Sequence, residues 1–264
     1  ASGFNNHGTA VAGVIGAALD GAGTVGVAHG ATLVGYRVAY GTAGTVDMFA
    51  SQLWRAAETD VVNNSWGYNG FFTDNFRNPA ARPLELALEH GVAAGRDGLG
   101  TVYVFAAGNN RSGGDNVNHH NLQNAPEVIT VGALDASGKF AKFSTPGAAL
   151  LVSAPGTSIL TTDRTGSDGY ASGDTASVNG TSFAAPIVSG IVALMLEANG
   201  DLGWRDVHEI LAYTARQVDP TGAWTTHKGG KFTGGGLQDS NDYGCGLVAA
   251  AAGVRLAVRW EAQS

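Results

Sequence analysis

Residues 180–186, GTSFAAP, place a serine directly in front of a long apolar segment. Residues 183–196 read FAAPIVSGIVALML and are almost all apolar, which predicts a buried helix. Because proline is tolerated in a helix only in the first turn, Pro186 requires that this helix begin close to Ser182. Ser182 therefore either caps the helix with its hydroxyl group, or uses the unpaired backbone N–H groups and the helix dipole for chemistry at a carbonyl group.

Two further segments carry residues that would cooperate with a reactive serine. Residues 7–13, HGTAVAG, begin a predicted helix of small residues, and residues 104–109, VFAAGN, place Asn109 in a turn after a buried strand. Each has an ordinary structural explanation, as a histidine at a helix start and as a common Gly-Asn turn. In combination, His7 supplies a base for the hydroxyl of Ser182, while the Asn109 amide and the Ser182 backbone N–H supply two donors for an oxyanion.

These segments resemble the subtilisin-like serine proteases, the subtilase family. The motifs HGTAVAG, AAGN and GTSFAAP occur in the family's order and cover nearly the whole chain. The resemblance implies that Ser182 is the nucleophile, His7 the general base and Asn109 the amide of the oxyanion hole. A fourth match, NNSWG at residues 63–67, implies that Ser65, Trp66 and Gly67 form an extended edge with which the substrate backbone pairs as an added strand.

Several details resemble the kexin and furin branch of this family more than the bacterial subtilisins. They are Trp66 and the segments GLGTVYV (98–104), LMLEAN (194–199), LGWRDV (202–207) and YGCGL (243–247). Members of that branch cut after basic residues, which they hold with carboxylates. Here Gly70 and His120 stand at two of the acidic positions, while Asp115 matches another and Asp74 is a further candidate. Specificity for basic residues is therefore not supported.

The family's third catalytic residue, an aspartate, precedes the histidine in the chain, and no aspartate precedes His7 here. Asp20 follows the histidine helix, and Asp60 leads into a strand where the family has an acidic residue with a structural role. Either the chain is N-terminally truncated and lacks the strand with the catalytic Asp, or it has lost its acid. We favour truncation, because losing a central strand would expose both of its neighbours. Without the acid that orients the histidine, this segment alone is expected to be a weak or inactive enzyme.

Composition excludes several classes of protein. The chain has 264 residues, of which 44% are hydrophobic and 14% charged, so it can form one large domain and is not disordered. A net charge of −7 argues against nucleic acid as a partner. The single cysteine, Cys245, excludes an intrachain disulfide and is expected to be a small buried hydrophobe. The longest apolar run, about fourteen residues with a proline, is too short for a membrane span.

Strands alternate with helices along the chain, which predicts a parallel sheet with helices on both faces. The expected strands are 32–38, 60–64, 101–106, 127–133 and 150–153, and the expected helices after the one at His7 are 47–58, 80–94, 181–197, 204–215 and 246–258. Residues 68–79 form a polar and aromatic loop beside the site, and residues 219–242 a surface excursion. The expected fold class is α/β, a three-layer αβα sandwich with a mainly parallel central sheet, and residues 1–264 form a single subtilisin-like peptidase domain.

The resemblance also bears on metals, partners and location. The family commonly uses structural calcium, for which Asp20 and Asp115 are candidate ligands, although calcium requires six to eight oxygens and Thr145 stands where a partner carboxylate of Asp115 is expected. His119 and His120 are expected to be solvated rather than to bind zinc. No cofactor is expected for catalysis. The implied partners are a protein or peptide substrate and a propeptide inhibitor, and the implied location is secreted or periplasmic.

Two other functions remain open from the sequence. The chain is alternatively a pseudoprotease that binds peptides through the edge at residues 65–67 without cutting them. An esterase of another fold is disfavoured, because its serine would lie in a Gly-X-Ser-X-Gly turn and Ala184 stands at the second glycine position. The sequence upstream of Ala1 discriminates between protease and binder, since an Asp-Thr-Gly or Asp-Ser-Gly after an apolar strand supports the enzyme.

Overall fold

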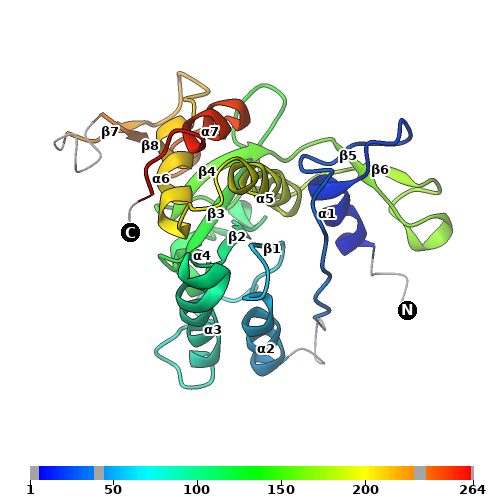
Figure 1. The fold of residues 1–264 in the computed structure, drawn as a ribbon. Coiled ribbons are helices and arrows are strands. Elements are labelled where there is room, and N and C mark those ends of the chain that lie inside the picture. The colour runs from blue at the N-terminus through cyan, green and yellow to red at the C-terminus, as the bar shows by residue number, and fades with distance from the viewer. Residues whose placement is uncertain (1–5, 39–44, 229–235, 263–264) are drawn as a thin grey trace.

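The structure, a computed structural model, describes residues 6–38, 45–228 and 236–262, and a parallel sheet of four strands forms its centre (Figure 1). The strands lie side by side in chain order: β1 (Val61–Asn64), β2 (Val102–Ala106), β3 (Val128–Leu134) and β4 (Leu150–Pro155). All residues of β2 and β3 are buried, as expected for strands that helices cover on both faces.

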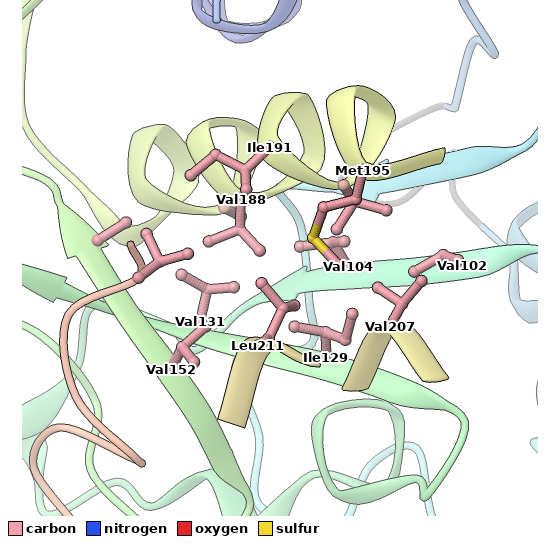
Figure 2. Close-up of a cluster of buried hydrophobic side chains, with 14 of the residues drawn as sticks. Val102, Val104, Ile129, Val131, Val152, Val188, Ile191, Met195, Val207 and Leu211 are labelled. Carbon is pink, nitrogen blue, oxygen red and sulfur yellow. The ribbon is translucent and has the colours of Figure 1, made fainter. Parts of the chain in front are cut away.

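Helices cover the two faces of this sheet. One face packs against α5 (Thr181–Ala198), α6 (Trp204–Thr214) and α7 (Ala250–Ala257), and Figure 2 shows Val188 and Met195 of α5 meeting Val104 of β2 in this core. The other face packs against α2 (Val46–Ala56), α3 (Arg82–Ala94) and the short α4 (Asn121–Asn124). Full burial stabilises by about 1.5–3 kcal/mol for each large apolar side chain. The three layers confirm the expected αβα sandwich.

Helix α1 (His7–Gly16) lies beyond the sheet and is held by a hairpin that the sequence did not predict, formed by β5 (Ile159–Thr162) and β6 (Thr175–Val178). The Thr161 hydroxyl donates to the carbonyl oxygen of Ala10 at 2.6 Å, and the Thr162 hydroxyl donates to that of Thr9 at 3.0 Å. Gly13 permits this approach, because a Cβ atom there would collide with both threonine side chains. The hairpin therefore fixes the helix that begins with His7.

The strand predicted at residues 32–38 is absent from the structure. A strand needs a hydrogen-bonded neighbour, and within the described ranges β1 pairs with β2 alone. A cavity of about 1030 Å³, lined by both β1 and residues 30–36, lies at the other edge of β1. Residues 32–38 are therefore of types that favour a strand, but they form no backbone hydrogen bonds with a neighbouring strand in the described ranges.

Smaller differences concern the C-terminal part. The last helix begins at Ala250 rather than at residue 246, because Leu247 forms bridges with Ser153 and Arg216. The excursion at 219–242, of which 229–235 lie outside the described residues, contains a short hairpin of β7 (Thr225–Thr226) and β8 (Gln238–Asp239). Short 3-10 turns complete the fold at Gly95–Gly98, Arg111–Gly113, Val117–His119 and Gly166–Asp168.

Helix α5 is the one helix in the described ranges that is long and apolar enough to cross a membrane by length and composition. Its 18 residues are 61% buried inside the protein, as expected of a helix that forms the core. The length and composition of α5 are therefore only weak evidence that it spans a membrane.

Candidate active site

Ser182 is the second residue of α5, at the carboxyl-end side of the sheet. The preceding Gly180 has a φ of 147°, a conformation that favours glycine, and its N–H donates to the carbonyl oxygen of Gly156 at 2.9 Å. This turn places Ser182 at the helix start without a capping hydrogen bond from residue 180. The backbone N–H of Ser182 therefore belongs to the first turn, where N–H groups have no partner within the helix.

Asn109 lies in the turn after β2, and its side chain is fixed by Thr181. Its Oδ1 accepts hydrogen bonds from the Thr181 backbone N–H at 2.9 Å and from the Thr181 hydroxyl at 3.0 Å. Two donors on the oxygen leave Nδ2 as the free end of the amide, and Nδ2 lies 3.7 Å from where a Cβ atom of Gly180 would be. The amide thus presents its donor beside the start of α5, next to Ser182.

Ser65 joins the edge after β1 to the same helix. Its hydroxyl donates to the carbonyl oxygen of Ser182 at 2.8 Å and accepts from Asn63 Nδ2 at 2.9 Å. Asn63 Oδ1 in turn accepts from the hydroxyl of Ser189, also on α5, at 3.0 Å. This chain of hydrogen bonds sets the position of the edge relative to Ser182.

The other two predicted edge residues differ in what they expose. Trp66 turns its indole inward, where it packs against the rings of Phe49 and Phe105 with centroids 4.6 and 5.6 Å away. Its Nε1–H donates to Asn64 Oδ1 at 3.0 Å. Gly67 is exposed, so the backbone is the accessible part of the edge at both positions.

His7 is the first residue of α1 and packs against the residue that follows Ser182. The ring centroids of His7 and Phe183 are 5.4 Å apart. Burial lowers the pKa of His7 below its usual 6.5, because the charged imidazolium loses hydration. Within the described ranges no carboxylate forms a hydrogen bond or ion pair with the ring, so nothing in them replaces the missing aspartate.

The cavity at the open edge of β1 reaches the site. His7 and Ser65 both line it, together with apolar residues of α1, of α5 and of the segment at 30–36. Figure 1 shows β1 as the edge strand of the sheet on the side of α1. Within the described ranges the edge of β1 away from β2 has no strand partner, and the cavity of about 1030 Å³ beside it has room for one more extended segment.

The predicted metal ligands lie apart from Ser182 and from each other. Asp20 is exposed, and its Oδ1 accepts from the backbone N–H of Ala22 at 3.0 Å. Asp115 is buried and pairs with His120 Nε2 at 2.9 Å, while His119 Nδ1 lies 3.7 Å away. In the part of the chain that the structure describes, no group of three or more His, Cys, Asp or Glu side chains gathers as a metal site requires.

The expectation that His119 and His120 are solvated is wrong for His120, which is 3% exposed. The reason is the hydrogen bond with the buried Asp115, which a sequence pattern of two histidines in a polar loop does not reveal. Asp74 is also buried, and its Oδ2 accepts from the backbone N–H of Leu122 at 2.8 Å.

Sequence reasoning missed Thr181, which fixes the Asn109 amide, and the Asn63–Ser189 pair, which fixes Ser65. The signal for Thr181 was its place between Gly180 and Ser182, where a hydroxyl at a helix start has several backbone neighbours to bond. Asn63 and Ser189 lie 126 residues apart, so no local pattern connects them.

Comparisons with known proteins agree with this geometry. A family model described as "Subtilase family" matches residues 1–246. The chain is 35% identical to human proprotein convertase subtilisin/kexin type 7, over 97% of this chain and 32% of the human protein. It is 32% identical to a calcium-dependent protease of Trichormus variabilis, over 96% of this chain and 40% of that one.

A solved structure, that of a serine protease of Aeromonas sobria, superposes with a TM-score of 0.87 and 25% identity, covering 99% of this chain and 54% of the other. The chain thus spans about a third of the human relative and about half of this structure. The extent of the family match and the identity over nearly the whole chain give one conclusion: the chain belongs to the subtilase family of serine endopeptidases, with relatives in its kexin-like branch.

Proposed function

We propose that this chain forms the larger part of the catalytic domain of a serine endopeptidase, with Ser182 as nucleophile, His7 as general base and Asn109 in the oxyanion hole. The observation that carries the proposal is the Asn109 amide, whose oxygen is held by Thr181 so that its donor lies beside the first turn of α5. Preorganised donors of this kind stabilise charge only where it develops in the transition state.

The reaction begins when the Ser182 hydroxyl attacks the substrate's peptide carbonyl and transfers its proton to His7. The resulting oxyanion accepts hydrogen bonds from the Ser182 backbone N–H and from Asn109 Nδ2. Collapse of this intermediate breaks the C–N bond, and His7 gives its proton to the leaving amine. Water then attacks the acyl-serine ester by the same route, with His7 again taking the proton, and releases the acid product and free Ser182.

The aspartate of the triad is proposed to come from a segment upstream of residue 1. The open edge of β1 and the cavity beside it offer space for that segment, and His7 is among the residues that line the cavity. A carboxylate there would hold the imidazole in the required tautomer and stabilise the imidazolium that forms during attack. Residues 1–264 are thus proposed to be a single domain that this segment completes.

The peptide substrate is proposed to pair with the backbone at Ser65–Gly67. The hydrogen bonds from Ser65 to Ser182 and from Asn63 to Ser65 support this role, because they set the edge at a fixed position relative to the nucleophile. An extended peptide added to a strand edge gains main-chain hydrogen bonds that do not depend on its sequence.

Of the two predicted calcium ligands, only Asp20 suits the ion. Asp115 is occupied by imidazole nitrogens, whereas calcium prefers six to eight oxygens. Asp20 is exposed in a glycine-rich loop and its carboxylate has no imidazole partner within the described ranges, so we propose it as a ligand of structural calcium, with carbonyls and water completing the shell. From the resemblance to the subtilase family, a secreted or periplasmic location and a propeptide inhibitor are proposed as well.

Labelling with a fluorophosphonate tests the proposed function on a protein that includes the upstream segment. We expect Ser182 to be modified and peptide hydrolysis to stop, and the Ser182→Ala variant to lose both reactions. Ser51→Ala, which changes an exposed serine on α2, is the matched control and should behave as wild type. Persistent hydrolysis by Ser182→Ala would overturn the proposal.

The second candidate is a peptide-binding pseudoprotease, favoured by the absence of a carboxylate at His7 in the described ranges. It predicts that peptides bind while Ser182 stays unlabelled, in the protein with its complete upstream sequence. Rapid labelling there excludes it.

A further inference from the structure

The loop that follows the Ser65–Gly67 edge exposes two adjacent phenylalanines. Phe71 is 49% exposed and Phe72 is 57% exposed, although apolar rings of this size are usually buried. Phe72 has a φ of 56°, a conformation that costs energy for any residue with a bulky side chain. Strain of this kind tends to occur at functional sites, where the surrounding structure maintains it.

The two rings are held in place by the segment around His119. The Phe72 backbone N–H donates to the carbonyl oxygen of His119 at 2.8 Å. The His119 ring lies 4.8 Å from the ring of Phe71 and 5.3 Å from that of Phe72, measured between centroids. A tight turn, with the Thr73 hydroxyl donating to the Gly70 carbonyl oxygen at 2.8 Å, closes the loop. The rings thus form a fixed aromatic platform, which we define as Phe71, Phe72 and His119.

The loop that carries Phe71 and Phe72 directly follows the Ser65–Gly67 edge, and the segment after His119 contacts that edge. Gly67 approaches Gln123 so closely that a Cβ atom would be 2.7 Å from Gln123 Nε2. Gln123 Nε2 also donates to the carbonyl oxygen of Ala106, the last residue of β2, at 3.4 Å. The segment of the platform is therefore joined both to the proposed substrate edge and to the strand that leads to Asn109.

The charges around the platform do not suit a basic side chain. The carboxylate of Asp74 faces inward, is 1% exposed and accepts a backbone hydrogen bond from Leu122. Asp115 is buried in its pair with His120. The loop's exposed charged group is Arg77, which repels other cations. The surface offered beside the edge is therefore aromatic.

We propose that Phe71 and Phe72 form an apolar subsite that takes a large apolar side chain, such as Phe or Leu, of the peptide substrate. This inference rests on the proposed function, because it places the substrate along Ser65–Gly67. In an extended peptide, side chains on one face recur every second residue, about 6.6 Å apart, so one substrate position meets the platform while its neighbours point away. The subsite selects by burying apolar surface of the substrate against the two rings.

Hydrolysis of a positional-scanning peptide library tests the subsite, with a protein that includes the upstream segment. At one substrate position we expect kcat/KM to be about tenfold higher for Phe or Leu than for Lys. A double variant, Phe71→Ser with Phe72→Gly, should lose this preference, so that kcat/KM for the Phe and Lys peptides becomes equal within about twofold. Glycine suits the backbone of residue 72, so the loop keeps its conformation.

Two single variants sharpen the interpretation. Phe71→Leu retains an apolar surface and should retain the preference. Leu86→Ser removes an exposed apolar side chain on α3, outside the platform, and should change nothing. A preference for Lys or Arg at every position, or an apolar preference that survives in the double variant, overturns the subsite.

Failure of the subsite is distinguishable from failure of the proposed function. Fluorophosphonate labelling of Ser182 reports on the chemistry alone. The difference in affinity between fluorescent Phe- and Lys-containing peptides for the Ser182→Ala protein, followed by anisotropy, reports on the platform without the chemical step. Tighter binding of the Phe peptide that the double variant loses supports the subsite, and equal binding of both peptides overturns it.

Discussion

At the scale of single residues, the two ends of the Asn109 amide have separate tasks. The oxygen joins Asn109 to Thr181, which is a structural role, and the nitrogen is left for the oxyanion, which is a chemical one. A substitution that changes only one end therefore separates stability from catalysis.

We expect Asn109→Asp to keep the fold, because a carboxylate still accepts from Thr181, but to lower kcat because it has no donor for the oxyanion. Removal of such a donor costs about 10²–10³ in kcat, a value measured in subtilisin itself. Steady-state kinetics and thermal unfolding measure the two effects. Thr181→Val should give a smaller loss of kcat, since the amide loses one of its two anchors. An unchanged kcat in Asn109→Asp would exclude the amide from the oxyanion hole.

The pKa of His7 is a direct test of the proposed upstream carboxylate. In this chain burial alone shifts the pKa below 6.5, so the imidazole should titrate at lower pH than a histidine in water. With the upstream aspartate in place, the pKa should rise, because a neighbouring negative charge favours the imidazolium. Proton NMR of the His7 ring across pH 4–8, compared with a His7→Gln variant for assignment, measures both values. The same pKa in both proteins would place the upstream carboxylate elsewhere.

At the scale of elements, the position of α1 depends on its contact with the β5–β6 hairpin. Gly13→Ala introduces a Cβ atom into the Thr161 and Thr162 side chains, which should destabilise the fold by about 1–3 kcal/mol. The matched control is Gly8→Ala on the same helix, where the Cβ atom meets nothing within 4 Å. That change should be neutral or stabilise by about 0.5–1 kcal/mol through helix propensity. Denaturant unfolding measures both, and equal effects would contradict this account of the contact.

The elements also show what a sequence can predict. Strands β1 to β4 and helices α2, α3, α5 and α6 were predicted within a few residues, because their apolar periodicity and their glycine and proline boundaries are local signals. The segment at 32–38 has the same local signal but no strand partner in the structure, so the prediction was wrong there. The β5–β6 hairpin was missed, since its strands have only four residues each and the connection between them is long.

The candidate site followed from the sequence only in part. His7, Asn109 and Ser182 were recognised because each lies in a distinctive motif, and their catalytic roles stay predictions. Thr181, 72 residues from Asn109, and the burial of His120 depend on contacts between distant segments, which local patterns do not contain. The orientation of an amide or a ring is decided by such contacts.

At the scale of the whole molecule, one half-buried histidine, whose Nε2 atom is shielded from solvent, links stability to pH. His208 on α6 has a pKa of about 4, lowered from 6.5 first by burial and then by the charge of Arg205. Because the unfolded chain binds the proton more tightly, stability is complete above pH 6.5 and falls as the pH decreases toward 4. The loss at pH 4 should be roughly 2–3 kcal/mol.

Thermal unfolding between pH 4 and 8 measures this loss, and His208→Gln should flatten the profile. His29→Gln, which changes an exposed histidine, is the control and should leave the profile steep. A flat profile in the wild type would contradict the role of His208.

In the part of the chain that the structure describes, one edge of β1 has no strand partner, and this has a consequence for how the protein behaves in solution. A strand that offers free N–H and C=O groups is a template for another chain, so two or more copies should associate through it, edge to edge. Light scattering should show concentration-dependent assembly of the 264-residue chain, which Val61→Lys or Val61→Pro suppresses and a protein with the upstream segment does not show. Persistent assembly in both variants would place the contact elsewhere. The state of association in solution therefore reports whether the open edge of β1 is covered by another strand.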